Sequence, residues 1–162
     1  MKRIGIFVIL LATGCSQSTA ATCRPGDQDG VIGVHVTRLV SVNDDTFAVG
    51  GLPNADSGLA PQRNITIQNL STLTLTLTNV GTKPHDLVFH CIPSGLPAGC
   101  PATSCFPSSA NVPTIAPGES ATTRFTTPAV EGPYPFTSDE PGDSVEGANG
   151  TFTGLVGEIT LE

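Results

Sequence analysis

The sequence contains no tryptophan, one tyrosine, and only 7 lysines and arginines against 14 aspartates and glutamates. Lys2 and Arg3 lie in the N-terminal segment that we expect to be removed on export. The remaining 5 basic and 14 acidic residues give a net charge of −9. A surface this acidic repels nucleic-acid phosphates and anionic lipid headgroups. We therefore expect no nucleic-acid partner.

The sequence also lacks the motifs of the common enzyme classes. It has no glycine-rich phosphate loop, no zinc motif, and no Cys/His or Ser/His/Asp set at the spacing of a known family. Ser138, His85 and Asp143 would form a triad only if Asp143 lay beyond His85 as seen from Ser138, and nothing in the sequence requires that order. We predict that the protein is not an enzyme.

The residue pattern predicts an all-β sandwich. No long stretch has helical period, and 14 prolines and 18 glycines divide the chain into short segments. Apolar residues alternate from 31 to 42, and Leu73, Leu75 and Leu77 alternate with threonines in the most regular predicted strand. Branched threonines on the outer face of that strand favour an exposed antiparallel sheet. Residues 31–162 suffice for one domain with a single core.

The N-terminus is typical of bacterial export. Residues 1–14 have two basic residues and then an apolar run too short for a permanent membrane helix. Ala12 to Cys15 resemble a lipobox, which predicts lipidation of Cys15 and a membrane attached through the acyl chains. Residues 15–30 would then be a tether. The alternative is an ordinary signal peptide cut near Ala20 or Ala21.

If Cys15 is lipidated, four cysteines remain: Cys23, Cys91, Cys100 and Cys105. An even number in an exported protein predicts disulfides, and four cysteines allow three pairings, among which the sequence does not choose. The rival hypothesis is a thiolate metal site formed by three of them beside His90. Their irregular spacing and an oxidising compartment favour disulfides.

The C-terminal stretch, residues 132–162, predicts a strand, an acidic glycine-rich loop, and a closing strand with its apolar residues on one face. Tyr134 and Phe136 mark the first strand, Pro141 and Gly142 a turn, and residues 155–159 the start of the last strand. This arrangement resembles the ligand loop of the cupredoxins, the blue copper family. The resemblance covers roughly residues 61–162 and implies a Greek-key β-sandwich or barrel.

The resemblance also implies a set of copper ligands, most of which are replaced. His85, in the run from Asn79 to Phe89, resembles the first histidine ligand of the family. Ser138 stands where the family has its cysteine, Asp143 where it has the second histidine, and Leu155 where it has the axial methionine. A serine cannot supply a thiolate, and leucine cannot bind copper, so the blue copper chemistry should be absent.

His85 lies on the same face of its predicted strand as Leu87 and Phe89, so it should point towards the core. One hypothesis is a charge-assisted hydrogen bond between His85 and Asp143 that ties together the strands that copper would have bridged. A second is a site for a hard metal or Cu(II), with a nearby acid such as Asp139, Glu140 or Glu146. An ordinary core histidine is the third.

From these observations we predict an exported, lipid-anchored, cupredoxin-like protein with a degenerate copper site. It would act as a binding or structural module at the cell envelope, with the membrane and an envelope protein as its partners. In a Gram-negative cell, the serine after Cys15 favours the outer membrane, facing the periplasm. The alternative is a copper-binding or electron-transfer protein that uses a non-blue ligand set including His85, so copper remains open as a cofactor.

Overall fold

The computed structural model describes residues 23, 25, 33–50 and 60–162. The predicted signal peptide, Cys15 and most of the predicted tether lie outside these residues, as do Val31 and Ile32 at the start of the first predicted strand. Among the described residues, no helix has the length and apolar character needed to cross a membrane.

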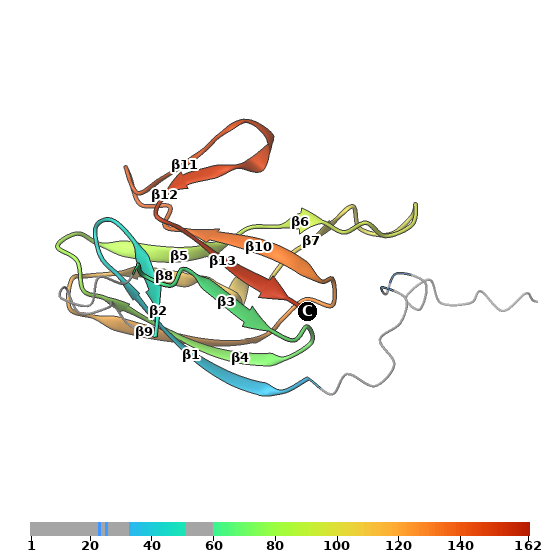
Figure 1. The fold of residues 1–162 in the computed structure, drawn as a ribbon, viewed down its shortest axis with the longest axis horizontal. Coiled ribbons are helices and arrows are strands. Elements are labelled where there is room, and N and C mark those ends of the chain that lie inside the picture. Colours follow the sequence, from blue (N-terminus) through green and yellow to red (C-terminus); the bar gives the residue numbers. More distant parts are fainter. Residues whose placement is uncertain (1–22, 24, 26–32, 51–59) are drawn as a thin grey trace, which may run out of the picture.

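Two main sheets pack face to face in the described part of the chain (Figure 1). One has the strand order β2-β1-β4-β9 and consists of β1 (His35–Val42), β2 (Phe47–Val49), β4 (Thr72–Asn79) and β9 (Ser120–Thr126). The other has the order β3-β13-β10-β5-β8 and consists of β3 (Asn64–Ile67), β5 (His85–Phe89), β8 (Val112–Ile115), β10 (Gly132–Thr137) and β13 (Val156–Leu161). The chain crosses between the sheets after β2, β3, β4, β8 and β9, as in Greek-key sandwiches. The predicted all-β sandwich is confirmed.

The core follows the predicted alternation most closely in β4. Leu73, Leu75 and Leu77 are fully buried, whereas the intervening threonines face outward. Burying each such leucine contributes about 1.5–3 kcal/mol of hydrophobic free energy. The expected antiparallel sheet is only half right, because β4 pairs antiparallel with β9 but parallel with β1. A parallel neighbour needs a long crossover between the paired strands, which residue alternation within a strand does not reveal.

Aromatic rings fill the space between the sheets. Phe47 and Phe136 meet edge to face at 5.2 Å between ring centroids, and Phe89 stacks on Phe106 at 4.4 Å. Gly157 in β13 lies beneath Phe136, where an added Cβ would come within 2.2 Å of the ring. This glycine therefore leaves the space that the buried ring occupies.

Residues 91–105 form a hairpin that we call the disulfide hairpin. It contains β6 (Ile92–Pro93) and β7 (Thr103–Ser104), and Cys91 is bonded to Cys105 at its base. The second disulfide joins Cys100 in the hairpin to Cys23. Cys23, Cys91, Cys100 and Cys105 are therefore paired as two disulfides, and the prediction that these four cysteines form disulfides is confirmed.

The loop before β13 is more ordered than predicted. It contains a second hairpin, which we call the projecting hairpin, formed by β11 (Ser144–Glu146) and β12 (Phe152–Gly154) around a 3-10 turn at Ala148–Gly150. This hairpin stands out from the sandwich (Figure 1). Its strands have three residues each, which is too short for an alternation that would predict them.

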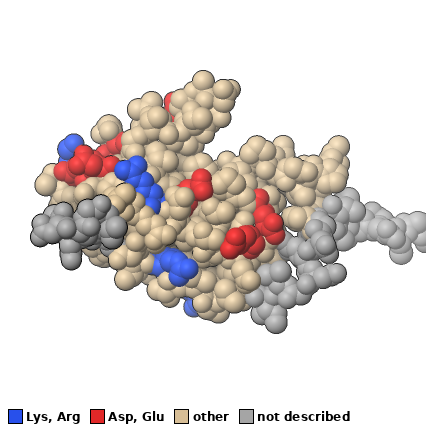
Figure 2. Space-filling model, viewed as in Figure 1, with Lys and Arg blue, Asp and Glu red and all other residues tan. Residues whose placement is uncertain are grey.

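Charged side chains are sparse on the sandwich, and the face in Figure 2 shows them in separate groups. The disulfide hairpin has none, because the sequence contains no Asp, Glu, Lys or Arg from Cys91 to Gly118. Acidic residues instead collect on the loops around the start of β5. The candidate site lies at that end.

Candidate functional site: a histidine between two carboxylates

His85 is the first residue of β5, and its side chain is completely buried. The strand alternates buried and partly exposed residues, with His85, Leu87 and Phe89 on the inner face. The predicted orientation of His85 towards the core is therefore correct. A polar ring in this position must find hydrogen-bond partners among its neighbours, because burial without them costs several kcal/mol.

The turn that leads into His85 is fixed by Asn79, which is itself fully buried. Its side-chain amide donates to the carbonyls of Lys83 at 2.7 Å and Ile115 at 3.0 Å. Its carbonyl oxygen accepts from the Gly81 N–H at 2.9 Å. One asparagine thus fixes the start of β5 relative to β8.

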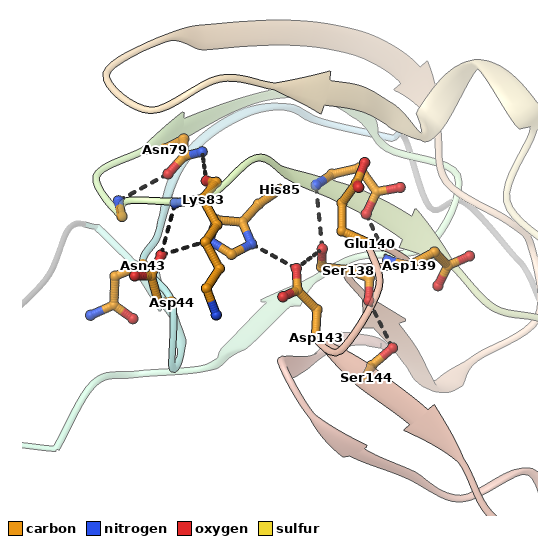
Figure 3. A network of polar contacts seen from close by, with 12 residues as sticks. Asn43, Asp44, Asn79, Lys83, His85, Ser138, Asp139, Glu140, Asp143 and Ser144 are labelled. Carbon is orange, nitrogen blue, oxygen red and sulfur yellow. Dashed lines mark hydrogen bonds and ion pairs between the residues drawn. The ribbon is translucent and has the colours of Figure 1, made fainter.

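Asp44 approaches His85 from the turn between β1 and β2 (Figure 3). Its Oδ1 lies 3.2 Å from His85 Nε2 and accepts from the Thr82 N–H at 2.8 Å, while Oδ2 accepts from the Thr82 hydroxyl at 2.5 Å. These bonds from Thr82, with a smaller contribution from His85, hold the pKa of Asp44 well below its usual value. Asp44 is therefore a carboxylate at neutral pH.

Asp143 approaches the same ring from the loop after β10. Its Oδ2 lies 2.6 Å from His85 Nδ1 and accepts from the Ser138 hydroxyl at 2.5 Å (Figure 3). Its side chain is only 7% exposed, and Ser138 is fully buried. The structure therefore brings together Ser138, Asp143 and His85, the three polar positions that the sequence singled out. We call Asp44, His85, Ser138 and Asp143 the His85 network.

Leu155 closes the network through its backbone. Its N–H donates to the Asp143 carbonyl at 2.7 Å, and its carbonyl accepts from the Ser138 N–H at 3.3 Å. The leucine side chain is buried in the core. Leu155 therefore lies beside Ser138 and Asp143, the other two positions at which the sequence departs from the cupredoxin ligand set.

Solved structures with a similar arrangement of strands were found, whereas no protein-family model and no curated protein matches the chain. A reduced auracyanin from Roseiflexus castenholzii shares 20% identity at a TM-score of 0.48, covering 82% of this chain and 99% of its own. Auracyanin A, a blue copper protein from Chloroflexus aurantiacus, shares 16% sequence identity at a TM-score of 0.47. The match covers 79% of this chain and 99% of auracyanin A. A purple cupredoxin from Nitrosopumilus maritimus shares 17% sequence identity at a TM-score of 0.39. The match covers 76% of this chain and 98% of the purple cupredoxin. These neighbours are cupredoxins. Similarity at this level concerns the fold and implies nothing about a metal, a ligand or a partner.

The imidazole of His85 has a carboxylate oxygen at each nitrogen. Carboxylates only accept hydrogen bonds, so the ring satisfies both partners only when it donates from both nitrogens, which is its cationic form. The arrangement is then one positive charge between two negative charges, drawn from three separate loops. Such a pairing fixes the loops at this end of the sandwich relative to one another.

The order of groups in the His85 network differs from that of a nucleophilic triad. Asp143 lies between Ser138 and His85, so the serine hydroxyl donates to a carboxylate and not to the imidazole. General-base activation needs the serine against the histidine, with the acid on the far side. The network therefore does not have the geometry that would activate Ser138.

The residues at this site do not fit a cupredoxin copper centre. The chain has one methionine, Met1, and Cys23, Cys91, Cys100 and Cys105 are all held in disulfides. Of the other histidines, His35 is exposed beside Arg124, and His90 stacks on Phe152 while its Nε2 contacts the Thr137 hydroxyl. Neither is in contact with His85. Among the described residues, no group of three or more His, Cys, Asp or Glu could hold a metal ion.

Of the other acids proposed for a metal site, Asp139 and Glu140 bond elsewhere. Asp139 Oδ1 accepts from Thr137 at 2.8 Å, and Glu140 accepts from Thr114 at 2.5 Å. Glu146 is an exposed residue of β11. Asp86, next to His85, receives the Asp139 N–H at 2.7 Å, and burial raises its pKa. Asp86 reaches the His85 network through its backbone, whose N–H donates to the Ser138 hydroxyl at 3.4 Å.

Sequence analysis missed Asp44. The run Asn43-Asp44-Asp45 indicates a turn, and Asn43 does cap it by accepting the N–H groups of Asp45 and Thr46. The contact of Asp44 with a histidine 41 residues away depends on the packing of two turns at one end of the sandwich. The one hint in the sequence was the acidic side chain of Asp44, in a turn that Asn43 already caps.

Proposed function

We propose that this chain is an exported, lipid-anchored, cupredoxin-like module of the cell envelope in which the His85 network takes the place of a copper centre. In this role the network keeps the loops at one end of the sandwich in a fixed arrangement, and the protein acts as a binding or structural module without electron transfer. The observation that carries the proposal is the engagement of both nitrogens of His85 by Asp143 and Asp44.

A metal at His85 would have to displace one of these carboxylates from the ring. Imidazole ligates metals through an unprotonated nitrogen, whereas here each nitrogen lies within hydrogen-bond distance of an acceptor. Among the described residues, the surroundings of His85 contain neither the thiolate nor the thioether that tunes a blue copper site. These features favour an empty, internally paired site over the alternative copper-binding or electron-transfer protein.

Dialysis of the folded chain against Cu(II), Zn(II) or Ca(II), followed by elemental analysis, tests the proposal. We expect far less than one equivalent of each metal, and no loss of binding in His85→Ala relative to the parent chain. One equivalent of copper that disappears in His85→Ala but persists in His35→Ala would establish the non-blue copper site and refute the proposal.

The envelope location is supported by the two disulfides, which are typical of proteins exported to an oxidising compartment. Lipidation of Cys15 predicts that cells fed a labelled fatty acid incorporate the label into the chain. Cys15→Ala should abolish labelling and release the protein from the membrane fraction. Labelling that persists in Cys15→Ala, or its absence from the parent chain, would contradict the anchor.

A further inference from the structure

The disulfide between Cys91 and Cys105 joins two directly opposed positions at the base of the disulfide hairpin. β6 and β7 pair antiparallel with Ile92 opposite Ser104 and Pro93 opposite Thr103. The next pair in that register is Cys91 and Cys105, whose Cα atoms are 4.3 Å apart. The bond therefore closes a short loop, with a sequence separation of 14, that already has its own backbone pairing, including Ser94 N–H to the Ala102 carbonyl.

The two disulfides differ in their exposure to solvent. Cys91 and Cys105 are both exposed, whereas Cys23 and Cys100 are partly buried. An incoming thiolate must approach a sulfur atom along the axis of the disulfide bond, so access limits the rate of exchange. Exposed disulfides are accordingly the labile ones, and buried disulfides resist reduction.

The disulfide hairpin contains no acidic side chain that would repel an anionic attacker. The chain carries a formal charge of −7, and its acidic groups repel a thiolate from most of the surface. The disulfide hairpin and the segment after it contain no charged residue from Cys91 to Gly118 (Figure 2). A thiolate therefore meets no neighbouring carboxylate of that segment on its way to this bond.

Thr103 distinguishes the two sulfur atoms. Its Oγ1 lies 3.9 Å from Cys105 Sγ, and because a disulfide sulfur carries no hydrogen, the hydroxyl is the donor. A thiolate that forms at Cys105 would receive this hydrogen bond, which stabilises it as a leaving group. Among the described residues, Cys91 has no matching donor, so attack at Cys91 with departure of Cys105 is the favoured direction.

We propose that Cys91–Cys105 is a thiol–disulfide exchange site that accepts two electrons from a dithiol reductant. One thiolate of the reductant attacks Cys91 Sγ, the Cys91–Cys105 bond breaks, and Cys105 leaves as a thiolate beside Thr103. The second thiolate of the reductant then attacks the sulfur bonded to Cys91 and releases Cys91. The reductant becomes a disulfide, and two protons convert Cys91 and Cys105 into thiols.

Exchange at this site would loosen the hairpin without opening the core. Phe106, which follows Cys105, stays packed on Phe89 and edge to face against Tyr134. Ser104 contacts the Tyr134 hydroxyl at 2.8 Å, so the only tyrosine of the chain reports on the base of the hairpin. The bond between Cys100 in the hairpin and Cys23 stays intact in this step, so the loosened hairpin remains joined to Cys23.

The test is graded reduction of the folded chain with dithiothreitol, trapping with N-ethylmaleimide, and mass spectrometry of the peptides. We expect Cys91 and Cys105 to be labelled at a reductant concentration at least about tenfold below that needed for Cys23 and Cys100. Burial raises the pKa of Tyr134 and its hydrogen bond to Ser104 lowers it, so a change in this pKa on reduction, measured by an absorbance titration of the phenol, reports a change at the base of the hairpin.

Two variants separate exchange from general loosening. Cys23→Ser with Cys100→Ser keeps only the proposed site and should be reduced at the same reductant concentration as the parent chain. Thr103→Val keeps the shape of the side chain but removes the donor, and should slow exchange several-fold while the unfolding midpoint of the oxidised protein is unchanged. Simultaneous labelling of all four cysteines, earlier labelling of Cys23 and Cys100, or unchanged exchange in Thr103→Val would overturn the assignment.

Discussion

The two ends of the sandwich fasten their loops to the core by different physical means. Around His85, three loops are joined by hydrogen bonds between charged groups, all within a few ångströms of one fully buried ring. At the other end, the disulfide hairpin has no charged residue and is held by Cys91–Cys105 and by stacked aromatic rings. One attachment responds to proton concentration and to the loss of a partner charge, and the other to reductants. Each end can therefore be tested with a perturbation to which the other end is insensitive.

The largest effect should come from His85→Ala. It leaves the Asp143 carboxylate, which is 7% exposed, without its cationic partner and also creates a cavity. Removing one member of a buried charged pair costs about 3–5 kcal/mol. Urea unfolding followed by circular dichroism measures the loss, and the exposed His35→Ala is the matched control, with an expected change within about 0.5 kcal/mol. Equal effects from the two variants would mean that His85 is not a structural centre.

Replacing Cys91 and Cys105 together by serine should cost about 3 kcal/mol, the loop-closure value for a ring of this length. Within the described part of the chain, no hydrogen bond or ion pair joins the hairpin to the His85 network, so this loss should add to that of His85→Ala within about 0.5 kcal/mol. A coupling energy well above that value, measured in the triple variant, would show that the two ends are one cooperative unit.

Gly81→Ala perturbs the His85 network without removing a polar group. An added Cβ would lie 2.4 Å from Asp44 Oδ1, so the carboxylate must move away from His85. Forced displacement in a packed site costs about 1–3 kcal/mol. In an Asp44→Ala background most of this cost should disappear, because the clashing atom is gone. Urea unfolding of the four chains measures the difference, and an undiminished cost would place the clash elsewhere.

The smallest effect, and the one that depends on pH, concerns Asp44→Asn. The folded state holds the pKa of Asp44 below its ordinary value of about 3.9. A depressed folded-state pKa contributes stability above that ordinary value, and the contribution is lost as the pH falls below it. The variant should therefore unfold more easily than the parent chain at pH 7 and approach it near pH 2. A difference in urea midpoint that is independent of pH would contradict the assigned pKa.

Regular strands and the faces of their residues could be predicted from the sequence, because alternation records burial directly. The buried leucines of β4 and the inward side of His85 are examples. The proximity of Ser138, Asp143 and Leu155 to His85 followed from a resemblance between loops, since residues 132–162 contain no local signal for a contact across 58 positions. Asp44 and the projecting hairpin were missed, because packing between loops and three-residue strands leave no periodic trace.

The outermost strands of the two sheets are β2, β9, β3 and β8. β2 has three residues and β3 has four, while β8 contains Pro113, which has no N–H to offer. β9 is longer, but Thr123 donates to the Ser109 carbonyl, so the segment at 108–110 lies against it. Copies of the chain that meet at high local density would therefore find few free backbone groups with which to extend a neighbour's sheet. β4, in which threonine and leucine alternate, would by itself favour fibril-like stacking. Its two edges are already paired with β1 and β9, so it cannot pair with another chain.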